Sequence, residues 1–204
     1  MQEKDYLGNV IKNVNSHSMK KSKITLIASV RKSDMAIAPK DREKHSELLF
    51  DIPIDKRHFA KTTSGKIVIS GRKTFKTIPP QYVPFDLGRE TVVITRQENL
   101  DVPDGVTLYG DLKKSVEDMQ RKFPGREIFI AGGGEIYNLS FDEIEVDEII
   151  LSVVNDKNEI EADVFFPTGW MDDFNLESKE IKEGFYRDKT PISFSIEIYK
   201  RKSM

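Results

Sequence analysis

Short apolar runs recur along the chain and are separated by polar segments that contain glycine, proline or charged residues. Each run is shorter than a free helix needs and is typical of a strand buried in a sheet. We predict strands at residues 24–30, 66–70, 91–95, 106–109, 127–131, 148–154 and 192–199, with the last two as a pair of edge strands.

One helix is predicted by its start and stop signals. Asp51 is a capping-type residue. Pro53 suits the first turn of a helix, because the backbone N–H that a proline lacks would have no hydrogen-bond partner at that position. Gly65 stands where such a helix would end. The sequence therefore predicts a helix that begins near Pro53 and runs to about Thr63.

Further helices are predicted between the strands. Residues 112–123 mix polar and apolar side chains as a surface helix does, with Asp111 as its cap, and short helices are expected at residues 71–75 and 135–139. Strands that alternate with helices and are followed by two consecutive strands predict an α/β fold. We expect a mostly parallel central sheet that ends in an antiparallel edge strand and is flanked by helices.

Two polar segments lie outside this alternation. Residues 1–22 are rich in Lys, Asn and Ser, but their apolar residues recur at helical spacing, so this extension is either a short amphipathic helix or disordered. Residues 35–50 are highly charged and are interpreted as a long, mobile loop. We expect an amino-terminal extension at residues 1–22 and a single domain at residues 23–204.

Composition narrows the function classes. The 32 basic and 34 acidic residues nearly cancel, which disfavours nucleic acid or a membrane surface as the partner and favours a small molecule. There is no cysteine, and His17, His45 and His58 are too scattered to suggest a metal site. No apolar run approaches the roughly 20 residues of a membrane span, so we expect a cytoplasmic protein.

Glycines follow two of the predicted strands, at Gly71 and at residues 132–134. A glycine followed by a helix start lets phosphate oxygens approach backbone N–H groups, although tight packing of strand on helix explains such glycines equally well. Arg72, Lys73 and Arg96 lie at or just beyond the carboxyl ends of strands, where open sheets bind ligands. As a cluster they favour NADPH over NADH, whereas each one alone is more simply a solvated surface residue.

Asp55 is the sharpest candidate for chemistry. On the predicted helix, Asp55 and Phe59 are four residues apart and therefore share a face, so a carboxylate lies beside an aromatic ring. Periodicity alone leaves a plainer interpretation open, in which Asp55 only stabilises the start of the helix through its charge.

From Ile24 to Pro167 the chain resembles the dihydrofolate reductase family. The motifs that carry the resemblance lie, in the family's order and spacing, at residues 24–28, 48–55 with Phe59, 68–75, 87–89, 130–137 and 162–167. The resemblance implies a three-layer fold of this family and the NADPH-dependent reduction of dihydrofolate to tetrahydrofolate for one-carbon metabolism. We expect a monomer, with dihydrofolate and antifolates as its small-molecule partners.

The resemblance implies a role for each residue of the substrate site. Asp55 would bind N3 and the 2-amino group of the pterin and support protonation at N5, with Ser152 as its hydroxyl partner. Arg89 would bind the glutamate carboxylate of folate, a task suited to a guanidinium group. The implied substrate site comprises Ile27, Ala28, Phe50, Asp55, Phe59, Ile78, Arg89, Ala131 and Ser152.

The cofactor site implied by the resemblance is built from the two glycine turns. Arg72, Thr95 and Arg96 would lie nearest the ribose phosphate of the adenosine. The complete implied set is Ala28, Ile37, Gly71, Arg72, Lys73, Thr74, Thr95, Arg96, Gly132, Gly133, Gly134, Glu135, Ile136 and Tyr137.

Four positions depart from the family pattern. Phe50 replaces the usual tryptophan, Ala38 the usual glycine, and Ala131 a larger aliphatic residue, while Glu135 stands where a basic residue is common. We expect altered affinity for diaminopyrimidine inhibitors and a weaker phosphate site unless Arg96 compensates. Two rival readings remain: a pyrimidine reductase of riboflavin synthesis, and a relative that binds NADPH without turnover.

Overall fold

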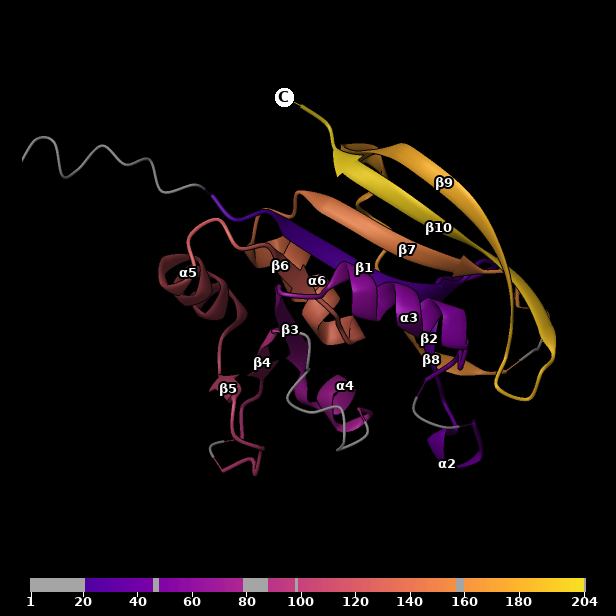
Figure 1. Ribbon diagram of the computed structural model, residues 1–204, viewed down its shortest axis with the longest axis horizontal. Helices are drawn as coiled ribbons and strands as arrows, with labels where there is room; N and C mark the ends of the chain where they lie inside the picture. Colours follow the sequence, from indigo (N-terminus) through magenta and orange to yellow (C-terminus); the bar gives the residue numbers. More distant parts are fainter. Residues whose placement is uncertain (1–20, 46–47, 79–87, 98, 157–159, 204) are drawn as a thin grey trace, which may run out of the picture.

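One large sheet and one small sheet organise the molecule. The computed structural model describes residues 21–45, 48–78, 88–97, 99–156 and 160–203 (Figure 1). Most of the expected extension, residues 1–20, lies outside these ranges. Within them, no helix combines the length and the apolar character that crossing a membrane requires.

Eight strands of the described ranges form a sheet in the order β5-β4-β3-β6-β1-β7-β10-β9. The pairs from β5 to β7 are parallel, whereas β10 is antiparallel to both β7 and β9, which confirms the predicted α/β sheet. The strands are β1 (Ile24–Arg31), β3 (Ile67–Gly71), β4 (Glu90–Ile94), β5 (Val106–Tyr109), β6 (Ile128–Ile130), β7 (Glu148–Val154), β9 (Phe174–Phe185) and β10 (Pro191–Arg201).

The predicted edge was wrong in one respect. Strands β7 and β10 lie inside the sheet, and the edge belongs to β9, which forms a long hairpin with β10 at one end of the sheet, drawn in orange and yellow in Figure 1. Most of β9 is exposed, and charged residues dominate its sequence. It has no apolar run, so the pattern that predicts buried strands is absent from it.

Helices cover both faces of the sheet and create its three layers. Leu26 and Val30 of β1 belong to a core with residues of α5 (Leu112–Lys122) and α6 (Gly134–Glu143). The alternate residue Ile27 belongs to a second core on the opposite face, against which α3 (Pro53–Thr62) packs. Because neighbouring strand residues point to opposite faces, the near-continuous apolar runs reflect burial on both sides.

The two predicted caps had different outcomes. The Asp111 carboxylate accepts a hydrogen bond from the backbone N–H of Lys114 at 2.6 Å and so caps α5 as predicted. Helix α3 has Ile52 at its cap position without a side-chain hydrogen bond. The Asp51 carboxylate instead forms ion pairs with Lys56 at 2.7 Å and Arg187 at 3.0 Å. It thereby links the start of α3 to the turn between β9 and β10.

The segment predicted as a long loop contains regular structure. Strand β2 (Ala36–Pro39) pairs with β8 (Ala162–Phe165), and α2 (Arg42–His45) follows it. Arg42 donates hydrogen bonds to both carboxylate oxygens of Asp163, at 2.6 and 3.2 Å. These bonds lower the pKa of Asp163 below its ordinary value, so the pair is ionised at neutral pH. The loop prediction was wrong for residues 36–39, because β2 pairs with a strand more than a hundred positions away along the chain.

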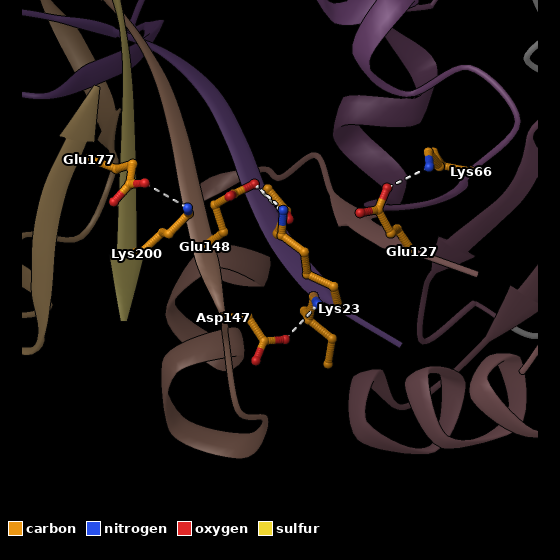
Figure 2. A network of polar contacts seen from close by, with 9 residues as sticks. Lys23, Lys66, Glu127, Asp147, Glu148, Glu177 and Lys200 are labelled. Carbon is orange, nitrogen blue, oxygen red and sulfur yellow. Dashed lines mark hydrogen bonds and ion pairs between the residues drawn. The ribbon is translucent and has the colours of Figure 1, made fainter. Parts of the chain in front are cut away.

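Charged pairs occupy the amino ends of several parallel strands (Figure 2). Lys23, before β1, contacts Glu148 of β7 at 2.7 Å, and Lys66, before β3, contacts Glu127, before β6, at 2.5 Å. Asp147 accepts the backbone N–H of Ile24 at 2.8 Å. The opposite, carboxyl ends of these strands surround the candidate site.

The remaining elements are the short helix α4 (Arg72–Lys76), which directly follows β3, and a 3-10 turn at Met171–Asp173. Trp170, just before that turn, is buried and packs edge-on against Phe166, Phe174 and Tyr199. Its role in the described structure is core packing.

Candidate functional site

A cavity of about 570 Å³ opens between α3 and the carboxyl ends of the central strands. Its lining includes eight of the nine residues predicted for the substrate site: Ile27, Ala28, Phe50, Asp55, Phe59, Ile78, Ala131 and Ser152. It also includes five predicted for the cofactor site: Ala28, Ile37, Lys73, Thr74 and Tyr137. In the described ranges, no group of three or more His, Asp or Glu side chains could hold a metal ion.

Asp55 lies at the sheet-facing side of α3 and is held by two serines. Ser152 of β7 donates a hydrogen bond to Oδ1 at 2.5 Å, and Ser29 of β1 donates one to Oδ2. Ser152 was expected as a partner, but Ser29 was missed. The only signal in the sequence is that Ser29 lies two residues after Ile27 and so shares its face of the strand.

Aromatic and aliphatic side chains surround this carboxylate. Phe59 lies one helical turn beyond Asp55 and lines the same cavity, as their spacing predicted. Phe50 comes from the segment before α3 and is 6% exposed. Ile27 comes from β1. A flat ring that enters the cavity would therefore meet apolar walls and, among the described lining residues, one carboxylate.

His58 also lines the cavity, and no sequence pattern singled it out. Its ring is half-buried, and its Nε2 has no hydrogen-bond partner among the described residues. Burial lowers the pKa of His58 below its ordinary value. The charges of Asp55 and Glu180 oppose this shift, and those of Lys182 and Lys61 reinforce it.

A lowered pKa at His58 makes the stability of the protein depend on pH. Below the ordinary value of 6.5, the unfolded chain takes up a proton that the folded chain resists, so stability is lost as pH falls through the folded pKa. We expect the parent to lose stability relative to a His58→Gln variant between about pH 7.5 and about pH 5. Urea unfolding of both proteins across this range measures the difference, and parallel stability curves would contradict the prediction.

The two glycine turns lie against each other beside the cavity. The N–H of Gly71 donates to the carbonyl oxygen of Gly132 at 2.6 Å, which joins the end of β3 to the turn after β6. A Cβ at Gly133 would lie 3.1 Å from Oγ1 of Thr74, and one at Gly134 would lie 2.6 Å from Val164. Side chains at these positions would crowd their neighbours, and the backbone N–H groups of the second turn, at the start of α6, suit the phosphates of a dinucleotide.

Of the basic residues predicted for the phosphates, Lys73 lines the cavity, whereas Arg72 and Arg96 lie outside its lining. Arg96 and Glu135 are both exposed and form an ion pair at 3.1 Å, so the acid that departs from the family pattern is in direct contact with one of the predicted arginines. The predicted cofactor residues outside the lining are Gly71, Arg72, Thr95, Arg96, Gly132, Gly133, Gly134, Glu135 and Ile136.

Arg89 is the one predicted substrate residue that does not line the cavity. Its Nη2 donates to the carbonyl oxygen of Ala60 at 2.7 Å, and the residue is only 9% exposed. The bond ties the segment before β4 to the last turn of α3. In this structure Arg89 therefore supports the helix that carries Asp55.

Tyr137 connects the second glycine turn to the floor of the cavity. Its hydroxyl donates to the carbonyl oxygen of Ile27 at 2.7 Å, and burial raises its pKa, so the hydroxyl keeps its proton at neutral pH. Tyr137→Phe leaves that carbonyl without its partner and should cost about 1–2 kcal/mol of stability. Chemical denaturation of the two proteins tests this, and an equal free energy of unfolding would show that the bond contributes nothing.

Comparisons with known proteins agree with one another. A family model described as dihydrofolate reductase matches residues 23–201. The dihydrofolate reductase of Pneumocystis carinii is 33% identical over 120 residues, and the match covers 56% of this chain but only 57% of that protein. The dihydrofolate reductase of Lactococcus lactis is 29% identical over 154 residues, covering 74% of this chain and 85% of the relative. Dihydrofolate reductase type A13 of Escherichia coli is 28% identical over 157 residues, covering 77% and 85%. Because this family model matches nearly the whole described length of the chain, the chain belongs to the dihydrofolate reductase family.

Proposed function

We propose that this chain is an NADPH-dependent oxidoreductase that converts 7,8-dihydrofolate to 5,6,7,8-tetrahydrofolate. One observation carries the proposal: a carboxylate, that of Asp55, is held by a hydroxyl on each of its oxygens at the edge of an apolar cavity. Such a carboxylate accepts two parallel N–H bonds from the flat edge of a pterin, at N3 and the 2-amino group. The names of the relatives support dihydrofolate over other flat heterocycles.

The residues of the cavity would bind and orient the substrate. Phe50 and Phe59 contact the ring and exclude water, while Asp55 sets its orientation and supports protonation at N5. When bound, NADPH supplies a hydride. Binding in a fixed geometry lowers the barrier because the reacting atoms no longer have to find each other.

The two glycine turns would hold the cofactor. Lys73 and Thr74 line the end of the cavity nearest the turns, and Arg72 follows Gly71 at the start of α4. Backbone N–H groups, a lysine and an arginine form a chemically suitable set for a diphosphate and a ribose phosphate. The proposal also covers a monomer whose cavity binds antifolates in competition with the substrate.

The decisive experiment follows NADPH oxidation by the full-length protein with dihydrofolate, with a ribosylaminopyrimidine, and with neither. Oxidation that depends on dihydrofolate supports the proposal. Oxidation that depends only on the ribosylaminopyrimidine replaces it with the pyrimidine reductase of riboflavin synthesis. Tight NADPH binding without turnover of either compound identifies a silent relative.

Arg72 provides a test of the cofactor assignment. We expect Arg72→Gln to weaken NADPH binding by about 10- to 150-fold and NADH binding by much less, because one charge-assisted hydrogen bond to a phosphate is worth about 1.5–3 kcal/mol. Calorimetric titration measures both affinities. Arg121→Gln on α5 is the control, since Arg121 pairs with Asp118 away from the cavity. Equal losses for the two cofactors would remove Arg72 from the phosphate site.

A further inference from the structure

We propose that Ser29 is a positioning residue for Asp55, which together with Ser152 fixes the plane of the carboxylate before the substrate binds. The proposal rests on the proposed function, because it concerns how the same site binds a flat ring with two neighbouring N–H donors. Ser29 was selected by neither the sequence patterns nor the family motifs, and the contact with Asp55 became visible only in the folded chain.

The geometry comes from strand register. Strands β1 and β7 are parallel neighbours, and Ser29 lies directly opposite Ser152. Both serines share the sheet face of Ile27 and Ile150, the face against which α3 packs. Two hydroxyls from adjacent strands therefore approach one helical carboxylate from the same side, and each takes a different oxygen.

This division leaves the carboxylate free to bind a ligand. Each carboxylate oxygen can accept about two hydrogen bonds, and each serine occupies one of those positions. With the hydrogen bonds of the described residues in place, one acceptor position per oxygen remains, and these two positions match a pair of parallel N–H donors. A third hydroxyl on either oxygen would leave no such pair.

Two hydrogen bonds also prevent a rotation of the Asp55 carboxylate that a single hydrogen bond would allow. The terminal torsion of an aspartate is broad, so a carboxylate held through a single oxygen can rotate about that contact. Held through both oxygens, it presents the same plane to every incoming ligand, and the ordering cost is met during folding instead of during binding. Removal of the Ser29 hydroxyl should therefore weaken substrate binding without moving the helix.

A matched pair of variants isolates the hydroxyl. Ser29→Thr keeps the hydroxyl donor and adds a methyl group. Ser29→Val has nearly the same shape as the threonine variant but lacks the hydroxyl donor. Both threonine and valine suit a strand. We expect kcat/KM for dihydrofolate to fall about tenfold in the valine variant relative to the threonine variant, a change of about 1.4 kcal/mol. The KM for NADPH should be the same in both, because the hydroxyl of Ser29 bonds to Asp55, whereas the proposed phosphate sites are the glycine turns.

A double-mutant cycle separates positioning from direct contact with the ligand. Folate binding is measured for the two Ser29 variants alone and in an Asp55→Asn background. If Ser29 acts through Asp55, the difference between valine and threonine falls below twofold once the carboxylate is gone. A difference that persists in the Asp55→Asn background would overturn the positioning role.

The remaining outcomes are also decisive. Equal kcat/KM values for the valine and threonine variants, with thermal unfolding confirming that both are folded, would overturn the inference while leaving the reductase assignment intact. Failure of the parent protein to reduce dihydrofolate is a different result, because it overturns the proposed function itself. A tenfold loss on valine with recovery on threonine supports the inference.

Discussion

Asp55→Asn is expected to lower the rate of dihydrofolate reduction by about 10²–10⁴-fold, the range in which a positioned acid–base group contributes to catalysis. The amide keeps the shape of the carboxylate but loses its charge and one acceptor oxygen. Its NH₂ group would face either Ser29 or Ser152, whose hydroxyls donate to the carboxylate in the parent. The substrate would lose one of its two hydrogen bonds and the charge that supports its protonation.

Steady-state NADPH oxidation measures this loss, and calorimetric titration with NADPH shows whether the cofactor still binds normally. Asp51→Asn is the matched control, because Asp51 precedes the same helix but pairs with Lys56 and Arg187 and does not line the cavity. Turnover by the Asp55→Asn variant within a few-fold of the parent would keep the reaction and remove Asp55 from its centre.

Gly132→Ala is expected to have the largest effect on stability. Gly132 has φ of +91°, and a Cβ there would lie 2.7 Å from ring atoms of Tyr137. The Tyr137 ring is buried and its hydroxyl is bonded to Ile27, so it has little freedom to move aside. Overpacking of a core costs about 1–3 kcal/mol, and an unfavourable backbone conformation adds about 1–3 kcal/mol. We therefore expect a loss of about 2–6 kcal/mol in the free energy of unfolding.

Gly65→Ala separates the two contributions. Gly65 also has a positive φ, +69°, but a Cβ there meets nothing within 4 Å. Only the backbone cost applies, about 1–2 kcal/mol. Urea denaturation of both variants gives the comparison, and equal losses would show that the contact with Tyr137 is relieved at no cost.

Much of the sheet could be predicted because its central strands are buried on both faces. Runs such as residues 24–30 and 148–154 need no knowledge of their neighbours to be recognised. Strand β9 and the short strand β2 lack this signal, since one is charged and the other consists of four residues. Strand β2 depends on β8, which is distant in sequence. Strand β9 depends on its pairing with β10, which becomes apparent only after folding.

The same division applies to the candidate site. Asp55 and Phe59 could be placed on one helix face from their spacing alone, and the family motifs led to Ser152. Ser29 could not be selected, because its importance depends on the register that sets it opposite Ser152. His58 was passed over because one histidine on a helix carries no pattern, and only burial made it distinctive.

Strand β9 has β10 on one side and, among the described residues, no strand on the other. An open row of peptide groups of this length could recruit a strand from another molecule and start aggregation. Lys179 pairs with Glu197 and Lys182 with Glu180, so charges are held along the edge. Another chain would have to desolvate those charges before its backbone could bond to β9. The charged residues of β9, which leave it without an apolar run, thus help to keep the protein dispersed when it is concentrated.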